Sequence, residues 1–354
     1  MKILIFNWRD IKNPDGGGAE VFTHEIAKRW VKKGHSVTLF CAGFKNCKKQ
    51  ETIDGVRIVR KGNRFSVYYH AFRFYKRGVY DIVIDEINTI PFFTPLYVKE
   101  KKIALVHQLA REFWFYEIPV LGVVGYLLEP LYMRLYSNTK TVTVSESTRK
   151  DLVSWGFRDV SIVSEGIDFA PLDSPAQKEK DFTMLFVGRM KKAKKPMDAI
   201  KAFRIIKREI PGAKLWMVGN GYMKLPKVDG VEYFGRVSGE KKRELMSRAH
   251  MLLVPAVREG WGLVVTEANA LGTPAVAYDV GGLRDSVKEG VTGVLCKNDP
   301  CDMSLGVLSL WKDEKYLNKY TLNALKDSKR YTWDRSAREF MCAINSIYDQ
   351  SSII

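Results

Sequence analysis

The chain has 354 residues, 46% of them hydrophobic and 27% charged, and no stretch rich in proline, serine or glutamine. These values exclude a short peptide or a disordered tail, and at about 150 residues per domain the length predicts two domains. With 57 Lys and Arg against 40 Asp and Glu, the formal net charge of +17 favours an anionic partner: a nucleic acid, an acidic lipid surface or a phosphorylated substrate.

Short apolar runs alternate with amphipathic stretches along the first half of the chain. We expect buried parallel strands at Lys2–Phe6, Ser36–Cys41, Val56–Val59, Ile82–Ile84, Ile103–Val106, Thr141–Val144 and Val160–Val163. The stretch Ala19–Lys33 predicts a helix that ends at Gly34.

After a less regular segment, Asp168–Asp181, the alternation of apolar runs and amphipathic stretches begins again. Further strands are expected at Phe182–Val187, Lys214–Val218, Met251–Val254, Pro274–Ala277 and Gly293–Leu295. The pattern predicts an α/β protein with two Rossmann-like doubly wound domains, residues 1–170 and 171–330, that face each other across a central cleft.

Several classes of protein are disfavoured. The longest uncharged apolar stretch, Ile118–Leu128, is far shorter than the ~20 residues of a membrane-spanning helix, and the apolar run at the N-terminus is too short for a signal peptide. Five cysteines without a C-x-x-C pair suggest neither a disulfide framework nor a zinc ribbon. We therefore expect a cytoplasmic protein without a bound metal.

Two glycine-rich turns are candidate phosphate sites. Gly16, Gly17 and Gly18 precede the first long helix, where free backbone N–H groups would suit a phosphate, although a mobile loop explains them equally well. The turn Gly219-Asn220-Gly221 matches the first half of the dinucleotide-binding motif G-x-G-x-x-G, but Lys224 occupies the position of the third glycine. No glycine is followed by lysine, which excludes a P-loop.

A denser arrangement lies in the second half. Glu259 and Glu267 are eight positions apart, and a glycine-containing turn separates Glu259 from a helix predicted to begin near Leu263. The start of that helix suits a diphosphate, and Glu267 one turn further on suits vicinal hydroxyls, as in a nucleotide-sugar pocket. The alternative is that Glu259 caps the helix and Glu267 is a solvated surface acid.

The motif from Glu259 to Glu267 resembles that of retaining glycosyltransferases of the GT-B fold, specifically glycosyltransferase family 4. The resemblance extends over nearly the whole chain, through Gly17-Gly18-Ala19-Glu20, Val144-Ser145-Glu146-Ser147, Gly166-Ile167-Asp168, Val187-Gly188-Arg189 with Lys194, Glu259 to Glu267, Gly281-Gly282 and Tyr331-Thr332-Trp333. It implies an N-terminal acceptor domain, a C-terminal donor domain and a last helix, 331–354, that crosses back toward the N-terminal domain. Glu165 and Asp285 depart from the family pattern, in which Asn and Glu are frequent at these positions.

The resemblance also implies roles for single residues. Arg189 and Lys194 would stabilise the leaving diphosphate in place of a metal, with Lys195 as the alternative lysine. Glu259 would contact the donor sugar, Glu267 the ribose, and His107 a sugar hydroxyl, although a lone histidine after a strand is more often structural. The implied catalytic residues are His107, Glu259, Arg189 and Lys194, and the implied donor-binding residues are Gly16, Gly17, Gly18, Gly188, Arg189, Lys194, Val237, Glu259, Gly260, Trp261, Gly262, Leu263, Val264 and Glu267.

The implied reaction is retaining, metal-independent transfer from a UDP- or GDP-sugar by front-side attack, without a cofactor. A glycan phosphorylase or hydrolase of the same architecture is the alternative. A nucleic-acid-binding protein is disfavoured, because no recognised binding motif accompanies the charge.

The acceptor is expected to be lipid-linked or a growing glycan. Residues 55–80 carry seven basic side chains and no acidic one, and Phe65, Tyr68, Tyr69 and Phe72 are spaced to form a stripe on a helix. This stripe either packs on the sheet or meets an anionic membrane surface. A second segment, Phe113–Tyr116 followed by Ile118–Leu128, is expected to line an acceptor pocket.

Overall fold

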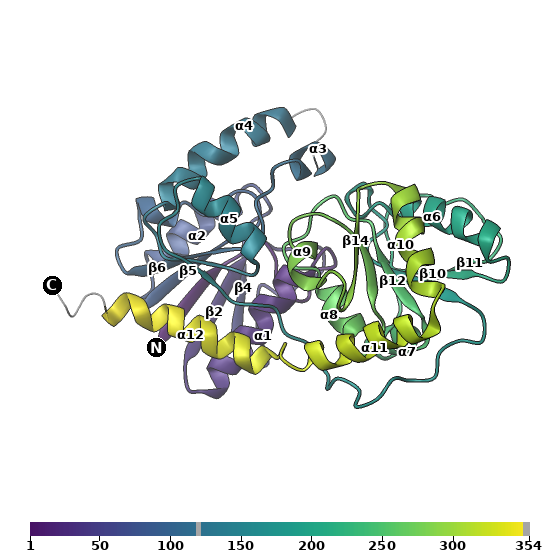
Figure 1. Cartoon of the computed structure of the whole chain (residues 1–354). Helices are drawn as coiled ribbons and strands as arrows, with labels where there is room; N and C mark the ends of the chain where they lie inside the picture. Colours follow the sequence, from purple (N-terminus) through teal and green to yellow (C-terminus); the bar gives the residue numbers. More distant parts are fainter. Residues whose placement is uncertain (118–121, 350–354) are drawn as a thin grey trace. The chain divides into compact units, whose positions relative to one another are not determined.

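The computed structural model describes residues 1–117 and 122–349, which belong to two compact units (Figure 1). The N-terminal unit comprises residues 1–166 together with the last helix, from Thr332 onward, and the C-terminal unit comprises Ile167–Tyr331. Each unit has a sheet and a hydrophobic core of its own.

The N-terminal unit contains an eight-stranded sheet in the order β3-β4-β2-β1-β5-β6-β7-β8. The strands are β1 (Lys2–Phe6), β2 (Ser36–Cys41), β3 (Gln50–Ile53), β4 (Val56–Arg60), β5 (Ile82–Ile87), β6 (Lys101–Val106), β7 (Thr141–Thr143) and β8 (Val160–Ile162). In the parallel register, Ile3 of β1 lies opposite Val37 of β2 and Ile82 of β5. The buried strands match the predicted apolar runs, as expected for parallel strands that are covered on both faces.

The antiparallel edge strand β3 was not predicted from the sequence. Its residues Gln50–Ile53 have no apolar run, and it pairs only with β4. Asp54 and Gly55 connect the two strands with φ angles of 50° and 80°, as a tight hairpin turn requires. The dipeptide Asp-Gly was therefore the available signal.

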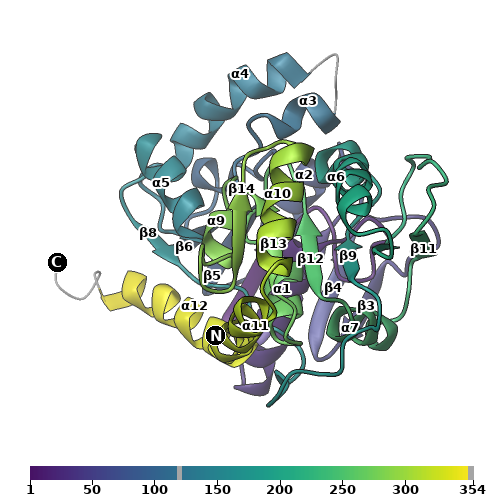
Figure 2. The same cartoon turned by 45° about the vertical axis from the view of Figure 1, so that its right-hand side comes forward.

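Helices cover both faces of this sheet. They are α1 (Gly18–Lys32), α2 (Val67–Tyr75), the short 3-10 helix η1 (Thr94–Leu96), α3 (Phe113–Glu117), α4 (Gly122–Met133), the 3-10 helix η2 (Arg134–Tyr136), α5 (Glu146–Ser154) and α12 (Trp333–Asp349). Helix α12 packs on α1, where the Phe340 ring contacts those of Phe22 and Trp30. Figures 1 and 2 show α4 and α12 on opposite sides of this unit.

The predicted aromatic stripe does not pack on the sheet as a whole. Helix α2 buries Val67, Ala71 and Tyr75, whereas Phe65, Tyr69 and Phe72 are exposed. The aromatic stripe and the buried face are therefore offset around the helix. Arg60, predicted as part of the basic surface, is instead buried and paired with Asp10.

The C-terminal unit has a six-stranded parallel sheet in the order β11-β10-β9-β12-β13-β14. Its strands are β9 (Thr183–Val187), β10 (Lys214–Val218), β11 (Val231–Gly235), β12 (Met251–Val254), β13 (Ala275–Tyr278) and β14 (Gly293–Cys296), and its helices are η3 (Lys192–Lys194), α6 (Pro196–Glu209), α7 (Gly239–Arg248), α8 (Leu263–Asn269), α9 (Leu283–Ser286), α10 (Pro300–Trp311) and α11 (Glu314–Ser328). Neighbouring side chains of β9 point to opposite faces: Met184 packs with Phe203 of α6, and Leu185 with Val265 of α8.

Both sheets have a point where the strand order reverses, between β1 and β5 in the N-terminal unit and between β9 and β12 in the C-terminal unit. In open α/β sheets, ligands bind beyond the carboxyl ends of the strands at such a point. The loops that follow β1, β9 and β12 position most of the candidate site residues, whereas His107 follows β6 and Val237 follows β11.

Candidate functional site

In the C-terminal unit, the loops after β9 and β12 meet. The Val257 amide donates a hydrogen bond to the carbonyl oxygen of Ala193 at 2.9 Å. Beside this contact, the Lys194 ammonium forms an ion pair with the Glu259 carboxylate, 65 positions further along the chain. Two residues predicted to act on one donor are thus in direct contact.

Lys195 points elsewhere. Its ammonium lies 3.4 Å from the Asp198 carboxylate and 5.2 Å from the centre of the Tyr278 ring, and it also contacts the Asn298 side chain. Of the two adjacent lysines, Lys194 is therefore the one that reaches Glu259. Arg189 lies half-buried in the loop that follows β9.

Glycines allow the loops at this edge to approach one another closely. A Cβ on Gly219 would lie 2.0 Å from the Gly188 carbonyl oxygen, and a Cβ on Gly282 would lie 2.2 Å from that of Glu259. Both glycines have positive φ angles, 130° and 79°. The backbone of Gly219 therefore packs directly against Gly188 of the predicted site, which a residue with a Cβ could not do.

Helix α8 starts within this group of loops. Gly262 precedes its first residue with a φ of 100°, and the buried Trp261 indole donates a hydrogen bond to the Thr266 hydroxyl at 2.8 Å. The first amides of a helix have no acceptors within the helix, so those of Leu263 and Val264 suit an anionic group. The buried Ser286 hydroxyl, which has no hydrogen-bond partner among the described residues, lies beside Gly262.

Glu267 lies one turn into α8 and is not a solvated surface acid. Its carboxylate accepts a hydrogen bond at 2.7 Å from Lys242 of α7, a residue that was not among the predicted site residues. Burial raises the pKa of Glu267, although the nearby Lys242 partly opposes this shift. Val237, predicted to bind the donor, is half-buried just before α7 and packs against the hydrophobic cluster between α8 and the sheet.

In the N-terminal unit, His107 follows β6 and is buried against carboxylates. Its Nε2 lies 3.2 Å from Glu86 Oε1, and its Nδ1 lies 4.0 Å from Glu165 Oε1. The Thr23 hydroxyl of α1 donates to the other oxygen of Glu86 at 2.6 Å. His107 Nδ1 is buried and has no hydrogen-bond partner among the described residues.

The environment of His107 favours the imidazolium form. Burial alone would lower its pKa, but the hydrogen bond and charge of Glu86, together with the charges of Glu165 and Glu20, raise it above the ordinary value. Burial in turn raises the pKa of Glu86. Glu165, which departs from the family pattern, thus contributes to the charge around the histidine.

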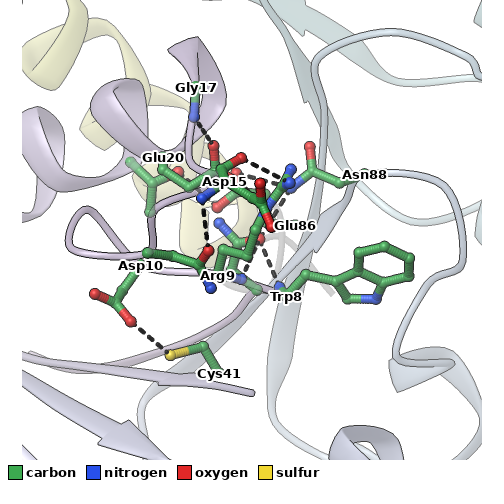
Figure 3. Close-up of polar contacts among 12 residues, drawn as sticks. Trp8, Arg9, Asp10, Asp15, Gly17, Glu20, Cys41, Glu86 and Asn88 are labelled. Atoms are coloured by element: carbon green, nitrogen blue, oxygen red, sulfur yellow. Dashed lines mark hydrogen bonds and ion pairs between the residues drawn. The ribbon is translucent and has the colours of Figure 1, made fainter. Parts of the chain in front are cut away.

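The predicted glycine turn lies at the carboxyl end of β1 in the same unit. Figure 3 shows Arg9 reaching toward Glu20 and Asp15, while Asp10 turns away from it toward Cys41. Arg9 Nε donates to the Glu20 carboxylate at 2.9 Å, and the same carboxylate accepts the Gly17 amide at 2.6 Å. The Gly17 N–H is therefore already bonded, and Gly16 and Gly18 flank it.

Asp10 links the loop after β1 to strand β4 of the sheet. Both of its oxygens accept hydrogen bonds from the buried Arg60 guanidinium, at 2.6 Å and 2.7 Å. This pairing lowers the pKa of Asp10 despite its burial. Asn88, which follows β5, donates to the Asn7 side chain at 2.9 Å and joins the ends of the two central strands.

The predicted site residues thus fall into two groups. Gly16, Gly17, Gly18 and His107 belong to the N-terminal unit, and all the others belong to the C-terminal unit. Glu86, Arg9 and Lys242 were not predicted from the sequence. The acidic pair Asp85-Glu86 at the end of an apolar run was a signal for Glu86, whereas the contacts of Arg9 and Lys242 depend on the fold.

No helix in the described parts of the chain is long and apolar enough to cross a membrane.

Comparisons with known proteins agree with this arrangement. Residues 172–327 match the model of the family described as glycosyl transferases group 1, and residues 16–170 match that of glycosyltransferase family 4. An uncharacterized glycosyltransferase of Methanocaldococcus jannaschii is 25% identical over 96% of each chain.

Solved structures share the fold. A sucrose-phosphate synthase from Thermosynechococcus elongatus aligns over 99% of each chain with a TM-score of 0.80 and 17% identity. The Anabaena protein HepE, in complex with UDP-glucose, aligns over 98% of this chain and 100% of its own with a TM-score of 0.74 and 16% identity. The chain is therefore a glycosyltransferase of the GT-B fold and belongs to glycosyltransferase family 4.

Proposed function

We propose that the protein transfers a hexose from a UDP- or GDP-sugar to an acceptor with retention of configuration and without a metal ion. The observation that carries this proposal is the contact between Lys194 and Glu259 beside the start of α8, at the point where the strand order of the C-terminal sheet reverses. The UDP-glucose complex of the neighbour HepE supports a nucleotide-sugar donor.

The chemistry requires stabilisation of a leaving diphosphate. Lys194, Arg189 and the amides at the start of α8 would supply positive charge and hydrogen bonds to its oxygens. Glu259 holds Lys194 in place, and its carboxylate would also bind a hydroxyl of the donor sugar. Glu267 would bind the ribose hydroxyls.

His107 would hydrogen-bond a hydroxyl of the donor sugar through Nδ1, the nitrogen that does not face Glu86. In the proposed front-side mechanism, the leaving phosphate oxygen accepts the proton of the acceptor hydroxyl. No protein nucleophile is then needed.

The acceptor is proposed to be lipid-linked or a growing glycan, met in the cytoplasm at the inner face of a membrane. Support comes from Phe65, Tyr69 and Phe72, which are exposed and lie near the cations of Arg64, Arg73 and Lys76. Aromatic rings and cations together suit an anionic lipid surface.

The donor site is tested by thermal shift with UDP, GDP and ADP in EDTA, using the wild type and Glu267→Ala. We expect UDP or GDP to stabilise the wild type without metal, and Glu267→Ala to abolish this shift because the ribose contact is lost. Glu209→Ala, at an exposed position at the end of α6, is the matched control and should keep the shift.

A folded wild type that no nucleotide stabilises would overturn the proposed donor site. Stabilisation that requires a divalent cation would contradict the metal-independent mechanism.

A further inference from the structure

Helix α4 has an outer face made of large apolar side chains. Val123, Val124, Leu127, Leu128 and Leu131 are each between 48% and 64% exposed, and Leu135 of η2 extends the row. Their spacing places them on one side of a helix. A surface helix of a globular protein normally shows the reverse pattern, with its apolar side toward the core.

The inner side of α4 is fixed by specific contacts. The buried Glu129 carboxylate accepts the amides of Ala110 and Arg111 at 2.6 Å and 2.7 Å. Gly125 and Gly122 lie close against Trp114 of α3, where a Cβ would clash. The helix therefore cannot turn to bury its leucines without breaking these contacts.

The contacts of Glu129 also determine the charge of the outer face. Glu129 is the one acidic residue of α4, and its carboxylate is held inside. Arg134 follows the helix and is exposed. The outer face is thus apolar, with a cation at its C-terminal end.

Residues 89–97, which follow β5, contact both α4 and α2. The Tyr132 hydroxyl of α4 donates to the Thr89 carbonyl oxygen at 2.8 Å, and the rings of Tyr97 and Phe72 are 5.2 Å apart. Leu96 between them is exposed. Val83 and Ile87 of β5, which point to one side of the sheet, pack with α2 and η2 respectively, so both helices cover that side.

We propose that the outer face of α4 inserts into the surface of an anionic lipid bilayer, with Arg73 of α2 and the flanking Arg64 and Lys76 contacting the headgroups. The helix has 12 residues and is too short to span the bilayer, so it would lie along the interface. Charge favours lipid over a second copy of this chain, because both copies would carry the same formal net charge of +17 and would repel each other.

The inference deepens the membrane part of the proposed function and rests on it, but not on the donor site. The test is flotation of the whole chain with vesicles of phosphatidylcholine, with or without about 30% phosphatidylglycerol, at about 0.15 M salt. The wild type should bind the anionic vesicles preferentially. The double variant Leu127→Gln, Leu131→Gln should bind at least about tenfold more weakly, because two inserted side chains become polar.

The matched control is Leu305→Gln, Leu322→Gln in the C-terminal unit, where the two leucines are 63% and 56% exposed. It should bind vesicles like the wild type. Every variant should keep the thermal shift with UDP or GDP, which separates a failure of the lipid surface from a failure of the donor site. Hydrogen exchange of the wild type should slow in α4, and not in α6, when anionic vesicles are added.

Three outcomes would overturn the proposal. These are a wild type that does not bind anionic vesicles, equal binding by the wild type and the α4 variant, or a dimer in sedimentation analysis that the α4 variant dissociates.

Discussion

At the residue scale, the contact between His107 and Glu86 makes a prediction about pH. Glu86→Gln should lower the pKa of His107, because it removes the carboxylate that favours the imidazolium. The folded-state pKa of His107 is raised, so its contribution to stability is complete below about pH 6.5 and is lost as the pH rises through the folded value. In Glu86→Gln the pKa of His107 is no longer raised by this carboxylate, so the variant should not lose stability in this way as the pH rises.

The free energy of unfolding should therefore differ most at low pH. We expect Glu86→Gln to be less stable than the wild type by about 1.5–3 kcal/mol at pH 6 and by a smaller amount at pH 9. Urea unfolding at both pH values measures the difference, and NMR titration of the imidazole measures the pKa. Glu165→Gln should lower the pKa less, since Glu165 is 4.0 Å away. A wild-type His107 that titrates at or below its ordinary value would refute the argument.

At the element scale, the loops after β9 and β10 approach each other closely. One added methyl group between them should therefore lower the free energy of unfolding strongly. Gly219→Ala would place its Cβ against the Gly188 carbonyl in addition to straining a positive φ. Gly290→Ala has a positive φ as well, 72°, but no atom within 4 Å of the added Cβ. The pair separates the clash from the strain within one unit.

We expect Gly290→Ala to cost about 1–2 kcal/mol of unfolding free energy, as left-handed backbone does for a residue with a Cβ. Gly219→Ala should cost about 2–5 kcal/mol and weaken the thermal shift with UDP or GDP, because the clash displaces the loop around Gly188. Urea unfolding of both variants checks this. Equal costs would mean that the loops move apart easily.

Elements differed in how well the sequence predicted them. The buried parallel strands were recognised because each is a continuous apolar run between polar loops. The edge strands β3 and β11 were missed because several of their side chains face water. The stripe on α2 left open which side of the helix meets the sheet, because periodicity identifies a stripe only. Resemblance to a family suggested Lys194 and Glu259, but their contact across 65 positions is visible only in the fold.

At the scale of the whole molecule, the chain leaves the N-terminal unit after Gly166 and returns to it after Tyr331. Helix α12 then completes the N-terminal core. Trp333, Phe340 and Ile344 are buried, and the Trp30 indole of α1 donates a hydrogen bond to the Ala337 carbonyl oxygen at 3.1 Å. The stability of this unit should therefore depend on a segment that follows the other unit in sequence.

Deleting residues from Thr332 onward should unfold the N-terminal unit and leave the C-terminal unit folded. Burial of three large side chains contributes about 5–9 kcal/mol, which is comparable to the whole stability of a domain. Hydrogen exchange should show that the amides of α1 lose protection while those of α6 keep it. Phe340→Ala should weaken α1 protection by about 3–5 kcal/mol, whereas Arg338→Ala, exposed on the same helix, should not. Equal loss of protection in α1 and α6 would show instead that the two units fold as one cooperative body.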